Sequence, residues 1–126
     1  MKRRLVVAHS ICKSEFGSAG IPDQHLSVLL RSMAVELAVS IKGSDLPPAT
    51  RLLKVYATSP DGPRRIVHLL AVEDGTLFLL FYRDKQDAVG ANVSIHNPAF
   101  RRQLHRHLKL LEDAIKASTF SIVEQD

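Results

Sequence analysis

Side chains that could act on a phosphodiester gather in the middle of this chain. Cations can hold phosphates and stabilise the extra negative charge of a pentacoordinate transition state. A tyrosine, histidine or lysine with an adjusted pKa could move the proton of a 2′-hydroxyl. The residues that could supply these groups are Lys54, Arg65, His68, Tyr82 and Arg83. The set indicates chemistry on the backbone of RNA, provided that the fold brings its members together.

A predicted hairpin decides which of these residues meet. The stretch "RRIVHLLAVEDGTLFLLFYRDK" (64–85) has two apolar strands around Asp74-Gly75, a dipeptide typical of a two-residue turn. That turn would pair Leu70 with Leu79, and it would place Arg65 with Tyr82 on one face and His68 with Arg83 on the other. Because side chains alternate along a strand, a single bulge would exchange these sets. The sequence leaves open which face looks toward Lys54.

Further cations extend the predicted RNA-binding surface. The formal net charge is +4, which favours an anionic partner. Some of the basic residues flank the predicted strands and others share the outer face of the last predicted helix. That helix face could instead be a solvated surface or dock an acidic partner segment. The expected RNA contacts are Arg51, Lys85, Arg101, Arg102, Arg106 and Lys109.

The elements that must position these residues follow from hydrophobic periodicity and turn residues. We expect strands at 4–10 and 51–57, the hairpin strands on either side of 74–75, and an edge strand at 119–123. Apolar spacing over 24–41 predicts one long helix, and 43–50 reads as a loop. Asn97-Pro98 marks the start of the last helix, as N-cap and first helical residue.

This order predicts an α+β fold of one domain spanning residues 1–126. Consecutive strands with short connections pair antiparallel. We therefore expect a small antiparallel sheet of about four strands, packed by N-terminal helices, with a C-terminal amphipathic helix. No membrane span or signal-peptide core is apparent, and a single cysteine, Cys12, suits a reducing compartment, so a cytoplasmic protein is expected.

Motifs for metals and cofactors are weak in this sequence. His105 and His107 stand two apart on a predicted helix, which points them to different faces. No phosphate-loop motif occurs, and Cys12 has no convincing base beside it. We therefore expect neither a metal nor a cofactor, and an inert thiol at Cys12.

The stretch "LLKVYATSPDGPRRIVHLLAVEDGTLFLLFYRDKQD" (52–87) resembles the RelE/ParE-like toxins of bacterial type II toxin–antitoxin systems. In that family a strand with a lysine precedes a glycine-containing turn, and an arginine, a hydrophobic pair and an aromatic residue follow. Arg65-Ile66-Val67-His68 matches the second part, with His68 where the family often has tyrosine. A hairpin then leads to an apolar strand that ends in a basic tail, matched by "LFLLFYRDKQD".

The resemblance implies a compact sheet and, for the RelE-like branch, a ribosome-dependent mRNA endoribonuclease that inhibits translation. Lys54 would then bind phosphate or move a proton, Arg65 would stabilise the transition state, and Arg83 or Lys85 would supply a second cation. A cognate antitoxin would be the protein partner and mRNA on the ribosome the substrate. The alternative is a non-catalytic basic domain of the same fold that inhibits a protein target, such as gyrase, as described for the ParE-like branch, or regulates one by contact.

Overall fold

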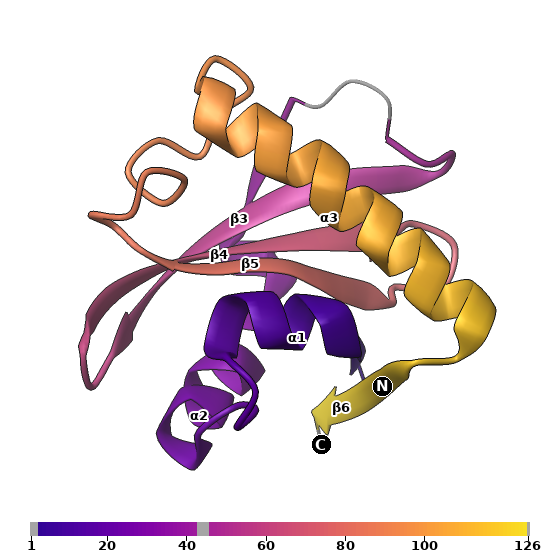
Figure 1. The fold of residues 1–126 in the computed structure, drawn as a ribbon, viewed down its shortest axis with the longest axis horizontal. Helices are drawn as coiled ribbons and strands as arrows, with labels where there is room; N and C mark the ends of the chain where they lie inside the picture. The colour runs from indigo at the N-terminus through magenta and orange to yellow at the C-terminus, as the bar shows by residue number, and fades with distance from the viewer. Residues whose placement is uncertain (1–2, 43–45, 126) are drawn as a thin grey trace.

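The computed structural model describes residues 3–42 and 46–125, which form an α+β protein (Figure 1). In chain order they are β1 (Arg3–Ala8), α1 (His9–Phe16), α2 (Asp23–Ser32), the 3-10 turn η1 (Val35–Leu37), β2 (Val39–Ile41), β3 (Thr50–Ser59), β4 (Gly62–Ala71), β5 (Leu77–Asp84), α3 (Pro98–Ala117) and β6 (Phe120–Gln125).

The sheet is larger than expected and mixed rather than purely antiparallel. It has six strands in the order β2-β3-β4-β5-β1-β6. The antiparallel run β3–β4–β5 is confirmed, and β6 is an edge strand paired with β1. However, β1 pairs with β5 in parallel, through Leu5 opposite Leu77 and Val6 opposite Phe78. A parallel pairing needs a long connection between its two strands, and here that connection is the whole of the chain from the end of β1 to the start of β5. Local sequence patterns therefore do not reveal the pairing.

The long helix predicted over 24–41 is wrong. The helix α2 ends at Ser32, and the same stretch continues through η1 into β2, which pairs with β3 from Val39–Lys54 to Ile41–Leu52. Its apolar residues fit helical spacing, but the β-branched Val39 and Ile41 favour a strand once β3 offers main-chain partners. In the predicted loop 43–50, residues 43–45 lie outside the described residues, and β3 already begins at Thr50.

Helices cover both faces of the sheet (Figure 1). On one face α3 packs Phe100, Leu104 and Leu111 against Val67 and Phe81. On the other face α2 packs Val28 and Leu29 against strand residues that include Leu5, Ile66 and Leu79. Each side chain of the strands therefore lies on one of two faces of the sheet, the α3 face or the α2 face.

Beyond the short stretch of β5 that pairs with β1, the helix α1 lies beside the edge of β5. Only Leu77 and Phe78 of β5 pair with β1, so the later part of β5 has no strand on that side among the described residues. The carboxylate of Glu15 in α1 instead accepts the main-chain N–H of Tyr82, over 2.8 Å. A side chain thus satisfies a main-chain donor that a neighbouring strand would otherwise pair.

The helix α3 begins as the sequence predicts. The side chain of Asn97 accepts the N–H of Ala99 over 3.1 Å, and Pro98 is the first helical residue. The helix is amphipathic, as expected: it buries Phe100, Leu104, His107, Leu111 and Ala114 and leaves Ile115 exposed. Among the helices in the described part of the chain, none combines the length and the apolar composition that a membrane crossing requires.

Candidate functional site

The turn of the β4–β5 hairpin is longer than the predicted two-residue turn. Leu70 pairs with Leu77 rather than Leu79, and the N–H of Gly75 bonds the carbonyl of Ala71 over 2.9 Å. Asp74 helps to widen this turn, because its carboxylate accepts the N–H of Thr76 over 3.0 Å. The predicted register is therefore wrong near the turn.

A bulge between Val67 and His68 changes the register again toward the open end of the hairpin. Beyond it Arg65 pairs with Arg83, and Ile66 pairs with Tyr82. Directly opposite residues share a face. Arg65 and Arg83 are thus together on the α3 face, in neither of the two combinations that the simple turn predicted.

The α3 face also carries Lys54 and Tyr56, which together with Arg65 form what we call the Tyr56 cluster. Tyr56 pairs with Arg65 across β3 and β4, and Lys54 pairs with Val67. The Arg65 guanidinium lies 4.2 Å from the centroid of the Tyr56 ring, and the Lys54 ammonium lies 5.5 Å from it. Tyr56 is 55% exposed. Lys54 and Arg65, both predicted site residues, are thus brought together around an exposed aromatic ring.

No carboxylate of the described residues forms an ion pair with Lys54 or Arg65. Both cations are half-buried, so their charges face less water than those at helix surfaces. Cations beside an aromatic ring suit a ligand that is both anionic and planar. The sequence interpretation did not include Tyr56, although its place two residues after Lys54 on a strand put both on one face.

Arg83 shares the α3 face, but acids occupy its guanidinium. Glu15 accepts from Nε over 2.7 Å and from Nη2 over 2.9 Å, and Asp87 lies 3.2 Å from Nη1. Burial by itself would lower the pKa of the Arg83 guanidinium. The two carboxylates together have the larger effect, so the pKa is raised. Its side chain is 20% exposed, and that of Glu15 is fully buried. Arg83 therefore ties α1 to β5 rather than offering a free cation.

Tyr82 lies on the α2 face, away from the Tyr56 cluster. Its hydroxyl is 2.7 Å from Nδ1 of His25, and Nε2 of His25 is 2.9 Å from the carboxylate of Asp61. The Asp61 carboxylate only accepts, so Nε2 of His25 is the donor to it. Burial raises the pKa of Tyr82. A raised pKa keeps the phenol protonated, so little phenolate is present to accept a proton.

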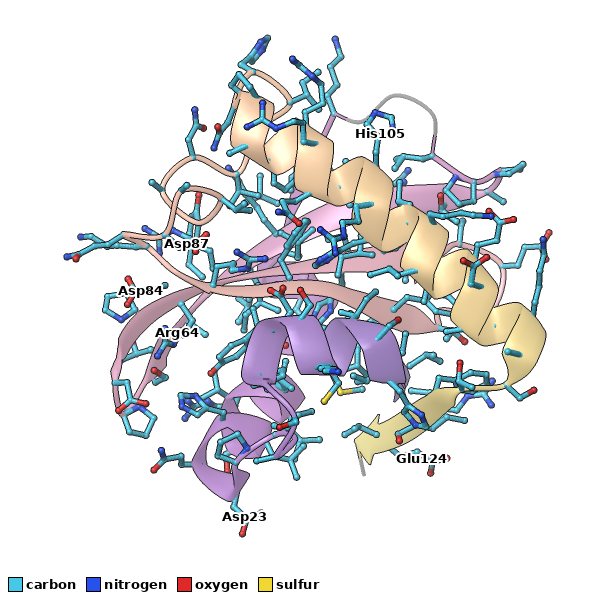
Figure 2. The ribbon with its side chains drawn as sticks, in the orientation of Figure 1. Asp23, Arg64, Asp84, Asp87, His105 and Glu124 are labelled. Atoms are coloured by element: carbon cyan, nitrogen blue, oxygen red, sulfur yellow. The ribbon has the colours of Figure 1, made fainter. Side chains whose placement is uncertain are left out.

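Arg64 lies beside the Tyr82 ring. Its guanidinium lies 5.7 Å from the ring centroid and pairs with Asp84 at 3.6 Å, as the labelled residues in Figure 2 illustrate. Arg64 also donates to Ser59 over 3.2 Å. The Tyr82 hydroxyl and the His25 ring are therefore buried away from a substrate, whereas the Asp61 carboxylate is 56% exposed.

His68 is completely buried on the α2 face. Ser32 donates its hydroxyl hydrogen to the Leu29 carbonyl over 2.6 Å, so it accepts from Nε2 of His68 over 2.9 Å. Nδ1 then has no hydrogen-bond partner in the described structure. Burial lowers the pKa of His68 to about 4. His68 and Tyr82 therefore do not share one site with Lys54 and Arg65.

The other predicted RNA contacts fall on three separate surfaces. Arg51 is exposed and stands two and four residues before Leu53 and Val55 on β3, so it shares the α2 face with them. Lys85 follows directly after β5. The remaining cations are exposed along α3, where Arg101 donates to the Ile95 carbonyl over 3.0 Å and Lys109 pairs with Asp113 at 3.3 Å. This α3 surface comprises Arg101, Arg102, Arg106 and Lys109.

Neither a metal centre nor a reactive thiol stands out. Within residues 3–42 and 46–125, no group of three or more histidine, cysteine, aspartate or glutamate side chains could hold a metal ion. Cys12 is half-buried, and burial raises the pKa of its thiol. A raised pKa keeps it protonated and weakly nucleophilic.

Comparisons with protein-family models, with curated proteins and with solved structures find no match for this chain. Function must therefore be argued from the site itself.

Proposed function

We propose that this chain binds RNA through the Tyr56 cluster and acts as the toxin component of a type II toxin–antitoxin system, with the RelE/ParE-like fold. Its substrate is mRNA on the ribosome, its place of action the cytoplasm and its protein partner a cognate antitoxin. The observation that carries the proposal is the exposed Tyr56 ring with the Arg65 guanidinium 4.2 Å from its centroid and Lys54 beside it. An unpaired base stacks on such a ring while the two cations hold the adjoining phosphates.

The cleavage reaction proposed for this surface is endonucleolytic and uses no metal. The 2′-hydroxyl of one nucleotide attacks the adjacent phosphorus, and the 5′-oxygen of the next nucleotide leaves. Arg65 stabilises the charge that develops on the phosphate oxygens, and Lys54 binds phosphate or moves a proton. The α3 cations Arg101, Arg102, Arg106 and Lys109, with Lys85, hold more distant phosphates.

A non-catalytic alternative is favoured by one observation. Two of the predicted proton-transfer groups, Tyr82 and His68, are buried on the α2 face, and acids neutralise Arg83. A domain that uses its basic surfaces only to bind would need no exposed proton-transfer group. Such a domain would inhibit a protein target or regulate it by contact.

Induction of the gene in a bacterial host tests the proposal. We expect growth and translation to stop and transcripts to be cut, and we expect Arg65→Ala, Lys54→Ala or Tyr56→Ala to relieve the arrest. Lys13→Ala is the matched control, because Lys13 is exposed on α1, outside the Tyr56 cluster. Equal protein levels and circular dichroism spectra must accompany the comparison.

The outcomes separate the alternatives. If growth and transcripts are unchanged by the wild-type chain, the toxin proposal fails. If growth stops but the three variants arrest it equally well and no transcript is cut, the nuclease proposal fails and the non-catalytic alternative remains. A short neighbouring reading frame that encodes a DNA-binding domain with an acidic tail would support the antitoxin partner.

A further inference from the structure

One of the two sides of β3 is paired with a neighbouring strand over only part of its length. On one side β4 pairs with it from Thr50 to Ser59. On the other side β2 pairs only with Leu52, Leu53 and Lys54. The stretch 55–59 therefore has no strand partner on that side among the described residues. An edge of five residues spans about 17 Å and resembles the sites at which proteins accept an added strand.

The main-chain groups of Thr58 and Tyr56 point to this open side. Thr58 stands opposite Pro63, which has no N–H to donate, and the carbonyl of Thr58 accepts from Nη2 of Arg31 over 2.9 Å. That carbonyl therefore points away from β4. Because the direction of main-chain groups alternates along an antiparallel strand, the N–H and C=O of Tyr56 point the same way. Among residues 3–42 and 46–125, no main-chain partner meets the N–H and C=O of Tyr56 on this side, so the edge offers one open donor and one open acceptor.

A hollow of about 230 Å³ lies beside this edge. Arg31, Ser32 and Leu37 line one wall, and β3 from Val55 to Thr58 lines the other. Leu37 is 73% exposed, the largest exposed fraction among the large apolar side chains of the described residues. Val55 and Ala57 belong to the α2-face core, so the hollow opens on that face. An apolar side chain placed here would cover Leu37.

Because side chains alternate between the two faces of a sheet, the two surroundings of this edge determine which residue types an added strand would need. Its residues opposite Val55 and Ala57 would point into the hollow, and its residue opposite Tyr56 would point to the α3 face beside Arg65. Lys54 and Arg65 have no carboxylate partner among the described residues, so acidic residues suit that face. A second copy of the chain would instead bring like charges together, because Arg31, Lys54 and Arg65 flank the edge.

We propose that the open edge of β3 binds an extended acidic segment of a partner protein, with apolar and acidic residues in alternation, as an added strand. The segment's main chain bonds Tyr56 and Thr58, its apolar side chains fill the hollow beside Leu37, and its carboxylates face Lys54 and Arg65. Arg31 already donates to this edge where a strand would. The main-chain bonds to β3 do not depend on the proposed RNA binding, but the carboxylates would use the same two cations, Lys54 and Arg65, so the segment and RNA would compete for this face.

Amide hydrogen exchange on the isotope-labelled full chain tests the site. The probe is a seven-residue synthetic peptide of alternating glutamate and valine with blocked ends. At saturation we expect exchange at the amides of Tyr56 and Thr58 to slow at least tenfold. The same peptide with lysine in place of glutamate, and one with a central proline, should give no protection. Amides of β6, the edge strand at the opposite end of the sheet, serve as the internal reference.

Two matched variants locate the contact. Leu37→Lys should weaken binding of the probe at least tenfold in a fluorescence anisotropy titration, because it places a charge in the apolar wall. Val72→Lys makes the same change at another exposed apolar residue, beyond β4, and should leave binding unchanged. Arg31→Glu, which reverses the charge at the edge, should also weaken binding, and thermal melts of each variant establish that it is folded.

Several results would overturn the proposal. One is slower exchange at β6 but not at Tyr56 and Thr58. Another is concentration-dependent protection of these two amides without any peptide, which would assign the edge to a second copy of the chain. Protection by a short oligouridylate in place of the peptide would assign it to RNA. Equal binding by Leu37→Lys and Val72→Lys would remove the hollow from the site.

Discussion

Histidines His25, His68 and His107 are buried, and their neighbours determine which ring nitrogen carries hydrogen. The Leu80 carbonyl lies 2.7 Å from Nδ1 of His107 and can only accept, so that nitrogen is the donor. Burial lowers the pKa of His107, and it lowers that of His68 to about 4. Both rings are therefore neutral structural groups at neutral pH, and His68 lacks a partner at Nδ1 in the described structure.

His68 should make the protein sensitive to acid. The unfolded chain takes up a proton at this ring near its ordinary pKa of 6.5, whereas the folded protein does so only at about 4. Stability is therefore fully present above 6.5 and is lost as the pH falls toward 4. At about 1.4 kcal/mol for each pKa unit, the loss is about 3 kcal/mol.

Urea unfolding between pH 7.5 and 4 measures this loss. His68→Leu should flatten the decline by about that amount, whereas His96→Leu, at an exposed histidine, should not. An unchanged slope in His68→Leu would show that other groups govern the acid sensitivity.

Gly90 meets the main chain that follows β5. A Cβ atom added at this residue would lie 2.0 Å from the carbonyl oxygen of Asp84 and 3.0 Å from Cβ of Arg83. The loop between β5 and α3 can therefore fold back only with glycine here. We expect Gly90→Ala to lower the free energy of unfolding by about 1–3 kcal/mol, measured by urea denaturation. Ala91→Ser, at the next and exposed residue, is the control, and equal stability of both variants would contradict the close approach.

At the scale of elements, a buried ion pair joins α1 to β5. The carboxylate of Glu15 bonds Arg83 at two nitrogens and also accepts the N–H of Tyr82. Glu15 is fully buried, so removing the arginine leaves an uncompensated charge in the interior. We expect Arg83→Met to cost about 3–5 kcal/mol of unfolding free energy.

A double-mutant cycle measures this coupling. Glu15→Gln with Arg83→Met should cost clearly less than the sum of the two single changes, because it leaves no unpaired charge. Lys109→Met breaks an exposed pair with Asp113 and should change stability by about 1 kcal/mol or less. Additive effects of the Glu15 and Arg83 changes would contradict the coupling.

Elements with strong local signals could be predicted from the sequence. Asn97-Pro98 starts α3 because the cap and the fixed proline act within one turn, and the antiparallel β3–β4–β5 run follows from short connections. The strand β2 could not be predicted, because the spacing of its apolar residues also fits a helix. Only its pairing with β3 decides between strand and helix. The parallel β1–β5 contact depends on partners far apart in the chain.

The candidate site was predictable only in part, for a related reason. Lys54 and Arg65 lie where strand order places them. The hairpin register, however, depends on the turn at Asp74 and on the bulge after Val67, and each shift changes which face a side chain joins. Tyr82 consequently lies in the α2-face interior instead of beside Arg65, and Arg83 takes its place. His68 lies on the α2 face because it is three residues from Arg65 on the same strand, as the predicted alternation requires.

For the whole molecule, the distribution of charge matters more than its sum of +4. Acids occupy the cations that tie elements together: Glu15 and Asp87 bind Arg83, and Asp61 and Asp84 lie beside Arg64. The cations without such partners in the described structure include the Tyr56 cluster and part of the outer face of α3. These two surfaces are where a polyanion would be held.

Salt dependence of RNA binding tests which of the two surfaces is used. Each phosphate neutralised on a single strand contributes a slope of about 0.7 to the fall of log affinity with log salt concentration. Lys54→Ala with Arg65→Ala should therefore reduce the slope by about 1.4, and Arg101→Ala with Arg102→Ala should reduce it similarly if α3 holds phosphates as well. Fluorescence anisotropy with a labelled single-stranded RNA between about 50 and 200 mM salt measures this slope.

The control is Lys13→Ala, which should leave the slope unchanged. An unchanged slope in the Lys54 and Arg65 double variant would mean that the Tyr56 cluster does not contact the RNA backbone.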